Sequence, residues 1–426
     1  MKFVTNLGLG ILGRPDDPNM WRKILSTRAM KRACQKAKRI LVVAGGHGTE
    51  VDILVELHGE EILSKIWMNE LLVCFTNNIV ARYPQINIAK GDFLSLNFNM
   101  KFNVVIGNPP YQDGGRDDQA NKLWPLFVKK AHELVEDNGY VGMITPNGWM
   151  QPTADIGKGT GVNALSIFND IFKKNNLILA NVDSDAIRET YFKGVGSTFS
   201  YYIFQKSKYS GNTKFITPTG PIDVDINNID SLPKVTSKES LGIMDRINGL
   251  AFPWHDQNHG LNGREGDTQG ILTEVKKVKK IEQTLTYNLQ HKVYHTNKNG
   301  GTYWYSEKIN PYANKPKVII SLSGKYLPVL DTSHGFSNMC LALVFNNLDH
   351  ATRAQFILNS KLYKFWVEMQ KFSGFNPRKQ ILTLPKLDLT KDWDDESIYK
   401  HFGLTDAECL YIDQFFAINI ESDDAK

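Results

Sequence analysis

Short apolar runs alternate with longer stretches of mixed polarity in the first half of this chain. Mainly apolar runs occur within residues 39–43, 65–70 and 104–107: a glycine-rich turn follows the first, the second ends at Glu70, and the third ends at Gly107. Runs rich in β-branched residues are typical of strands buried on both faces of a parallel sheet. Up to about residue 209 the pattern therefore predicts alternating strands and helices, which is the organisation of an α/β fold.

The alternation ends near residues 209–212, and the pattern after them is less regular. We place a domain boundary there and predict a first domain over residues 1–212 and an irregular α+β domain over residues 213–390. Beyond them acids outnumber lysines, which predicts an acidic C-terminal segment over residues 391–426 that repels nucleic acid. A chain of 426 residues with 42% apolar residues can build more than one core.

Composition indicates the cellular compartment and argues against disulfide, membrane-spanning and metal-binding features. The four cysteines lie far apart, without the paired spacing of a disulfide framework or a structural zinc site, which favours a reducing cytoplasm. No stretch predicts a membrane span, and the apolar first dozen residues lack the cleavage pattern of a signal peptide, so we expect a strand or loop there. The histidines form no convincing ligand set, and we expect no metal site.

Basic residues cluster in two parts of the chain, although the net charge is only +5. One is a predicted helix between Arg22 and Arg39 that contains no acid, and we slightly favour a solvated face over a phosphate-binding one. In the second domain, lysines are interleaved with aromatic residues, a combination that suits a polyanion and displaced bases. An ordinary aromatic core is an equally good explanation of any single residue. The residues concerned are Trp254, Tyr287, Tyr294, Tyr303, Trp304, Tyr305, Tyr312 and Tyr326, with Lys276, Lys277, Lys279, Lys280, Lys298, Lys308, Lys315 and Lys317.

A glycine-rich bend follows the first predicted strand, and acids follow the next strands. The run Gly45-Gly46-His47-Gly48 lies between a strand and a helix start, which is how a parallel α/β sheet brings backbone close to a nucleotide. Glu70 ends a predicted strand roughly 20 residues later, where a carboxylate can accept ribose hydroxyls. Asp92 and Phe93 would suit a hydrogen bond to an adenine edge and packing on its face. Plainer alternatives are a helix cap for Glu70 and a turn for Asp92.

The run Asn-Pro-Pro-Tyr at residues 108–111 follows the predicted strand that ends at Gly107. Prolines carry no N–H, so this loop offers carbonyl acceptors, and the side-chain oxygen of Asn108 lies beside them. Such oxygens can accept both hydrogens of a planar amine and concentrate its lone pair toward a methyl donor. The ring of Tyr111 can lie flat against a base that has left its helix. The alternative is an ordinary Asn-Pro turn.

In this order, the motifs resemble those of S-adenosyl-L-methionine-dependent amino-methyltransferases, specifically the N6-adenine DNA methyltransferases of restriction-modification systems. The resemblance covers about the first half of the chain. It implies a Rossmann-like class I methyltransferase sheet, S-adenosyl-L-methionine as cofactor and double-stranded DNA as substrate. Any cleavage of DNA would belong to a separate restriction endonuclease acting as a partner. The residues on the family's catalytic motif are Asn108, Pro109, Pro110 and Tyr111, and those on its cofactor motifs are Ala44, Gly45, Gly46, Gly48, Glu70, Asp92, Phe93 and Asn108.

One position departs from the family pattern. Family members usually carry an acid where Val42 stands, and this acid contacts the charged amino-acid end of the cofactor. Glu50, Asp52 or a group before the first strand are the candidates to supply the missing charge. The family resemblance also makes residues 213–390 a target recognition domain.

Two other classes of function share these motifs. One is a methyltransferase that acts on a protein glutamine amide or on RNA, but the protein-directed enzymes are shorter and lack a large domain after the catalytic one. The other is a non-catalytic nucleic-acid-binding relative that keeps the fold, an alternative to which Val42 lends weight.

Overall fold

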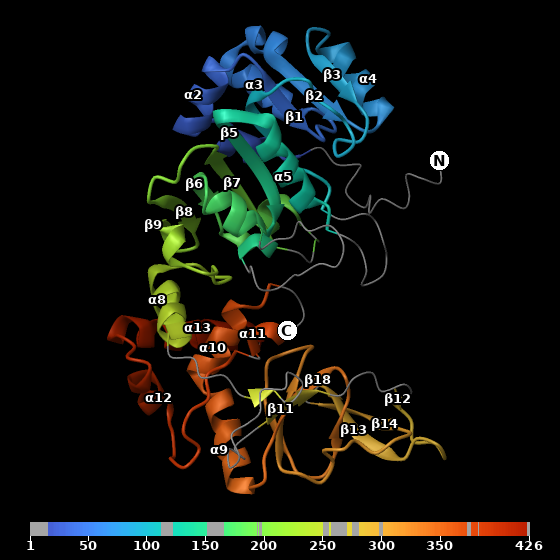
Figure 1. Ribbon diagram of the computed structural model, residues 1–426, viewed down its shortest axis with the longest axis vertical. Coiled ribbons are helices and arrows are strands. Elements are labelled where there is room, and N and C mark those ends of the chain that lie inside the picture. Colours follow the sequence, from blue (N-terminus) through green and yellow to red (C-terminus); the bar gives the residue numbers. More distant parts are fainter. Residues whose placement is uncertain are drawn as a thin grey trace. The chain divides into compact units, whose positions relative to one another are not determined.

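The computed structural model describes residues 16–111, 122–150, 166–193, 195, 198–249, 255–256, 271–274, 281–297, 301–372, 376–381 and 383–423. The chain divides into two compact units, Met1–Ser237 and Lys238–Lys426 (Figure 1). Each unit contains its own sheet structure and is treated separately below.

A nine-stranded sheet forms the centre of the first unit, in the order β3-β2-β1-β4-β5-β7-β6-β8-β9. β1 to β5 run parallel, and β7 is antiparallel to both β5 and β6. This confirms the predicted α/β fold with a Rossmann-like class I methyltransferase sheet. The strands are β1 (Ile40–Val43), β2 (Ile66–Glu70), β3 (Asn87–Lys90), β4 (Phe102–Gly107), β5 (Val135–Pro146), β6 (Asn176–Asn181), β7 (Phe199–Gln205), β8 (Thr213–Thr217) and β9 (Gly220–Val224).

The strand order reverses between β1 and β4, which are neighbours in the sheet. In open α/β sheets, ligands bind outside the carboxyl ends of the strands at such a switch point. The helices of this unit are α1 (Pro18–Leu25), α2 (Arg28–Lys36), α3 (Thr49–His58), α4 (Val73–Arg82), α5 (Trp124–Leu134) and α7 (Ser184–Tyr191), with the short turns η2 (Glu60–Lys65), η3 (Asn147–Met150), η4 (Ile167–Phe172) and η5 (Ile226–Asn228). The topology therefore predicts a ligand site at the carboxyl ends of β1 and β4.

The basic segment before β1 forms two helices rather than one. Asp17 caps α1 by accepting from the Asn19 N–H at 2.8 Å, and the Thr27 hydroxyl accepts from the Met30 N–H at the start of α2. A second cap interrupts the helix because the capping residue itself is not helical. The basic side chains of α2 are exposed, which agrees with the solvated face favoured from the sequence.

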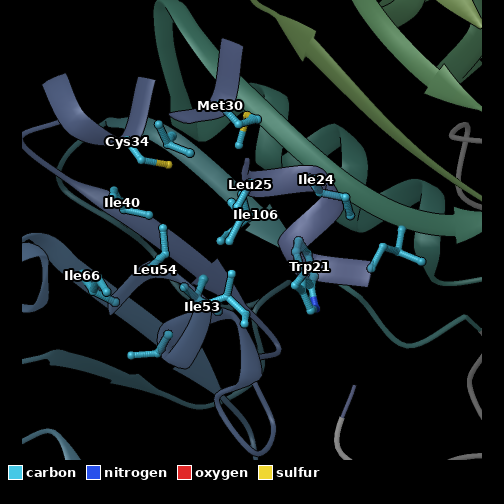
Figure 2. Close-up of a cluster of buried hydrophobic side chains, with 14 of the residues drawn as sticks. Trp21, Ile24, Leu25, Met30, Cys34, Ile40, Ile53, Leu54, Ile66 and Ile106 are labelled. Carbon is cyan, nitrogen blue, oxygen red and sulfur yellow. The ribbon is translucent and has the colours of Figure 1, made fainter. Parts of the chain in front are cut away.

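An apolar cluster fastens α1 and α2 to the sheet (Figure 2). Trp21, Ile24 and Leu25 of α1 are fully buried, together with Ile40 of β1 and Ile106 of β4. Burying large apolar side chains contributes about 1.5–3 kcal/mol each relative to leaving them exposed. The cluster therefore holds the start of α1 in a fixed place next to the central strands.

The first unit extends beyond the boundary predicted near residue 212. β8 pairs with β6 in the nine-stranded sheet, with Lys214 opposite Leu179, and β9 pairs with β8. Phe215 of β8 is fully buried. The boundary therefore lies after Ser237, because residues 213–224 complete the first sheet instead of opening a second domain.

The second unit contains helices and two sheets, in keeping with the α+β character predicted for the second domain. Its five-stranded sheet has the order β10-β11-β18-β15-β16, and its four-stranded sheet has the order β12-β14-β13-β17. The elements are α8 (Lys238–Gly249), β10 (His255–Asp256), β11 (Ile271–Glu274), β12 (Ile281–Glu282), β13 (His291–Thr296), β14 (Thr302–Ser306), β15 (Lys317–Ser321), β16 (Val329–Asp331), β17 (Gly335–Phe336), β18 (Cys340–Val344), α9 (Leu348–Asn359), α10 (Lys361–Met369), α11 (Arg378–Ile381), α12 (Asp395–His401) and α13 (Asp406–Asp423).

The acidic C-terminal segment is part of the second unit and not a separate one. Glu408 of α13 pairs with Arg246 of α8 at 3.0 Å, and Asp413 pairs with Lys361 of α10 at 2.6 Å. Ile412 is fully buried. The acids therefore alternate with apolar residues that complete the helical core, which the count of charges alone did not reveal.

Some aromatic residues of the second unit belong to its core, and others are exposed. Tyr294 and Tyr326 are buried, whereas Tyr287 is 90% exposed. The Lys292 ammonium lies 4.3 Å from the centre of the Tyr303 ring. The remaining candidates Trp254, Lys276, Lys277, Lys279, Lys280 and Lys298 lie outside the described residues.

The described part of the chain contains neither a candidate membrane-spanning helix nor a candidate metal site. None of its helices combines the length and apolar character needed to cross a bilayer. Within the same residues, no group of three or more His, Cys, Asp and Glu side chains is arranged to hold a metal ion.

We expect Gly107→Ala to destabilise the first unit, because a Cβ at this position would lie 2.5 Å from the Val43 carbonyl oxygen. That contact joins β4 to β1 through backbone, so relief requires the strands to move apart, at a cost of about 1–3 kcal/mol. Urea unfolding measures the difference.

Gly142→Ala on β5 is the matched control, since its Cβ would meet the flexible end of Met30 at 3.3 Å. Equal unfolding free energies for the two variants would contradict the close approach of β1 and β4.

Candidate active site

The glycine bend after β1 has an unusual backbone. Ala44, Gly46 and Gly48 all have positive φ, at 52°, 46° and 80°. The Gly48 N–H donates to the Gly45 carbonyl at 2.7 Å, and a Cβ at Gly48 would lie 2.1 Å from Ile79. Because Ala44 carries a Cβ, its left-handed conformation is strained, and such strain concentrates at functional sites.

Glu70 connects the end of β2 to this bend. One carboxylate oxygen accepts from the Gly46 N–H at 2.8 Å, and the other accepts from the Leu72 N–H at 2.9 Å. The side chain is 7% exposed. Each oxygen keeps a further lone pair, so Glu70 can accept hydroxyl groups while it holds the bend.

Asp92 and Phe93 follow β3, and the structure gives them local roles. Asp92 accepts from the Leu94 N–H at 3.0 Å and from the Ser95 hydroxyl at 2.7 Å, so it forms the turn considered as its alternative. Phe93 is 2% exposed and stacks on Phe127 with ring centres 5.2 Å apart. The position of Phe93 does not support a contact between its ring and a cofactor, and a contact of Asp92 stays a prediction.

The Asn-Pro-Pro-Tyr loop leaves β4 beside the glycine bend. Gly107, the last residue of β4, is opposite Val43, the last residue of β1. Asn108 and Tyr111 are half-buried, Pro109 is buried and Pro110 is exposed. Because the two strands are parallel neighbours, the bend and the loop emerge from the same edge of the sheet.

The side chains of Asn108 and Tyr111 are joined to each other. The Tyr111 hydroxyl donates to Asn108 Oδ1 at 2.6 Å, and the Tyr111 ring centre lies 5.2 Å from that of Phe199. Burial, and next the negative charge of Asp16, hold the pKa of Tyr111 well above its usual value, so the hydroxyl stays a donor. The carbonyl oxygen of Asn108 retains one lone pair for another donor.

Asp16 completes this group, and no motif in the sequence identified it. One of its oxygens accepts from Asn108 Nδ2 at 3.0 Å and the other from Trp21 Nε1 at 2.9 Å. Burial raises the pKa of the Asp16 carboxyl, while these two hydrogen bonds act in the opposite direction.

Glu50 is a second acid in this region, in the first turn of α3. Its side chain is 2% exposed, and burial, followed by the charge of Asp16, raises its pKa well above the usual value. Among the ion pairs formed by the described residues, Asp52 is paired with Arg82 at 3.2 Å, whereas Glu50 has no Lys or Arg partner. Val42 is fully buried in the core. Of the two acids considered as replacements for the one missing at Val42, Glu50 is thus buried and Asp52 is paired with Arg82, and a contact of either with the cofactor stays a prediction.

The segment that contains these residues is similar to known methylases. Residues 28–170 match the family model described as the Eco57I restriction-modification methylase. Over these residues the chain is thus similar to a restriction-modification methylase domain. The methyl donor of such a domain is S-adenosyl-L-methionine, as predicted.

A protein described as an uncharacterized adenine-specific methylase of Mycoplasma pneumoniae is 32% identical to this chain over 142 residues. The alignment covers 29% of this chain and 29% of that protein, so the chain spans less than a third of the relative it matches.

Two solved structures also resemble the chain. The type IIG restriction endonuclease BpuSI has a TM-score of 0.44 and 12% identity, covering 91% of this chain and 60% of that one. The type I restriction-modification methyltransferase subunit from Streptococcus thermophilus has a TM-score of 0.34 and 14% identity, covering 56% and 54%.

The structure thus brings together most of the residues proposed from the sequence. The bend at residues 44–48, Glu70 and the loop at residues 108–111 meet at one edge of the sheet. Phe93 is turned into the core instead. Sequence reasoning missed Asp16 because this residue lies 92 positions from Asn108 and belongs to no motif.

We expect Glu50→Gln to change how stability depends on pH. A carboxyl whose pKa is raised on folding keeps a proton that the unfolded chain has lost, so the free energy of unfolding falls as pH rises above the ordinary pKa of Glu. Glutamine does not titrate, and the variant should show a smaller fall in urea titrations between about pH 5 and pH 8.

Glu56→Gln, on the same helix, is the control with the opposite sign, because the hydrogen bond from Arg22 lowers the pKa of Glu56. A pH dependence of Glu50→Gln identical to that of the wild type would show that Glu50 is not the buried acid described here.

Proposed function

We propose that this protein transfers a methyl group from S-adenosyl-L-methionine to the N6 amine of an adenine flipped out of double-stranded DNA. The observation that carries this proposal is the meeting of the glycine bend and the Asn-Pro-Pro-Tyr loop at the switch point between β1 and β4. The glycine bend would hold the methyl donor there, and the Asn-Pro-Pro-Tyr loop would hold the methyl acceptor.

The residues around the bend fit the chemistry of the cofactor. S-adenosyl-L-methionine supplies a methyl group activated by a positively charged sulfur, and it also carries an ammonium group and a ribose diol. Glu70 would accept the ribose hydroxyls, and the backbone of Ala44, Gly45, Gly46 and Gly48 would line the site. The buried carboxyl of Glu50 would ionise beside the ammonium group, since an opposite charge favours the charged form of an acid.

The loop fits the chemistry of an amine that reacts poorly by itself. Asn108 Oδ1 and the Pro109 carbonyl would accept the two N6 hydrogens and direct the nitrogen lone pair toward the methyl group. Pro110 fixes the backbone of the loop. Tyr111 would pack its ring against the flipped base. The reaction needs no general base of unusual pKa, because the amine proton is lost after the methyl group has been transferred.

The second unit supports DNA as the substrate. Tyr287, in the turn before β13, and Lys292 of β13 present an aromatic and a basic group at the surface, and Lys292 lies over the partly exposed ring of Tyr303, which suits a target recognition domain. Protein-directed methyltransferases do not need such a unit. A separate restriction endonuclease would be the partner protein, and the cytoplasm would be the site of action.

Tritiated S-adenosyl-L-methionine offered with unmethylated genomic DNA, with RNA and with a translation release factor tests this function. We expect label in DNA, recovered as N6-methyladenine after nucleoside analysis. Label found only in RNA, or only in protein, would show that this molecule and not DNA is the substrate. Cofactor binding without transfer to any of the three would favour the non-catalytic relative.

We expect Asn108→Ala to abolish nearly all methyl transfer while it spares cofactor binding, because Asn108 provides one of the two amine acceptors. Removing one preorganised hydrogen-bonding group of this kind costs about 100- to 1000-fold in rate. Single-turnover transfer and calorimetry with S-adenosyl-L-methionine measure the two effects separately. Equal losses of transfer and binding would mean that the loop belongs to the cofactor site.

We expect Glu50→Gln to weaken the binding of S-adenosyl-L-methionine in calorimetry, because glutamine cannot form an ion pair with the ammonium group. Asp52→Asn is the matched control, since Asp52 is paired with Arg82 on the surface. Unchanged binding by Glu50→Gln would remove Glu50 from the cofactor site.

A further inference from the structure

Asp16 connects two parts of the first unit that lie far apart in the sequence. It lies directly before α1, and its two carboxylate oxygens accept from Trp21 Nε1 at 2.9 Å and from Asn108 Nδ2 at 3.0 Å. Trp21 is fully buried in the cluster that fastens α1 to the sheet (Figure 2). The carboxylate is therefore held by a rigid neighbour while it contacts the loop after β4.

The partners of Asn108 define the orientation of its amide. An ionised carboxylate only accepts, so Asp16 requires the NH2 group of Asn108 on its side. The Tyr111 hydroxyl donates to Oδ1 at 2.6 Å and therefore requires the oxygen on the other side. Both contacts select the same orientation, and a flipped amide would lose both hydrogen bonds.

We propose that Asp16 is a positioning residue that holds the Asn108 amide with its oxygen available to the target amine. This inference rests on the proposed function and adds a residue to it. A flipped amide would present its NH2 group to the NH2 group of the base, two donors that cannot form a hydrogen bond. The negative charge on Asp16 also polarises the amide and makes Oδ1 a stronger acceptor.

The neighbouring acid Asp17 has a different task, which makes it a control. Asp17 accepts from the Asn19 N–H at 2.8 Å and caps α1. Replacing Asp17 alters charge and helix capping at almost the same place in the chain, without removing the hydrogen bond between Asp16 and Asn108. The two acids therefore separate loss of orientation from loss of helix stability.

The first test compares Asp16→Ala with Asp17→Asn in single-turnover methyl transfer to unmethylated genomic DNA. Hydrogen bonds to a charged group contribute enough that we expect Asp16→Ala to slow transfer by about 10- to 100-fold. Asp17→Asn should transfer at the wild-type rate, and the dissociation constant for S-adenosyl-L-methionine, measured by calorimetry, should be unchanged in both. Wild-type transfer by Asp16→Ala, or a loss explained by weaker cofactor binding, would overturn the inference.

The second test exchanges the carboxylate and the amide between positions 16 and 108. Asn108→Asp places two carboxylates against each other and should be nearly inactive, since like charges at this distance repel strongly. When Asp16→Asn is added, the new amide at position 16 can donate to the new carboxylate at position 108. That carboxylate keeps an acceptor for the target amine, so methyl transfer should recover at least about 10-fold. Adding Asp17→Asn instead should recover nothing.

The outcomes separate this inference from the proposed function. A double variant no faster than Asn108→Asp alone, in a protein whose wild type methylates DNA, overturns the role of Asp16 and leaves the proposed function intact. A wild type that binds S-adenosyl-L-methionine and transfers nothing to DNA contradicts the proposed function and this inference together.

Discussion

The pairing of β1 with β4 is the constraint on which the account depends. Val43 and Gly107 end their strands opposite each other, and a side chain at Gly107 would collide with the Val43 carbonyl. The two strands can approach so closely only because this residue is glycine. Their pairing at the switch point makes the glycine bend and the Asn-Pro-Pro-Tyr loop neighbours, although their sequences are far apart. A donor and an acceptor of a methyl group can meet only if this register is kept.

Local signals made the centre of the fold predictable from the sequence. Apolar runs followed by glycine or proline mark β1, β4 and the loops after them, because both features act within a few residues. The sheet membership of β8 was not predictable in this way, since it depends on pairing with β6 across the chain. Asp16 was missed for the same reason, and so was the burial of Phe93 against Phe127, because both are set by contacts with distant residues.

Two buried acids, Glu50 and Asp16, bear on the charge of the ligand proposed for this site. Burial raises the pKa of both Glu50 and Asp16, and the charge of Asp16 raises the pKa of Glu50 further. Such an arrangement costs stability in the empty protein and is relieved by a positively charged ligand. In the proposed site, Glu50 on α3 would supply the charge that the family carries on β1 at the position of Val42, while Asp16 would act on Asn108.

The most direct measurement is a crystal structure of the protein with S-adenosyl-L-homocysteine. We expect the ligand to lie on the glycine bend, with its ribose hydroxyls on Glu70, its ammonium group near Glu50 and its sulfur facing Asn108. A ligand bound away from the bend, or one whose sulfur faces away from the Asn-Pro-Pro-Tyr loop, would contradict the claim that these two segments form one site for methyl transfer.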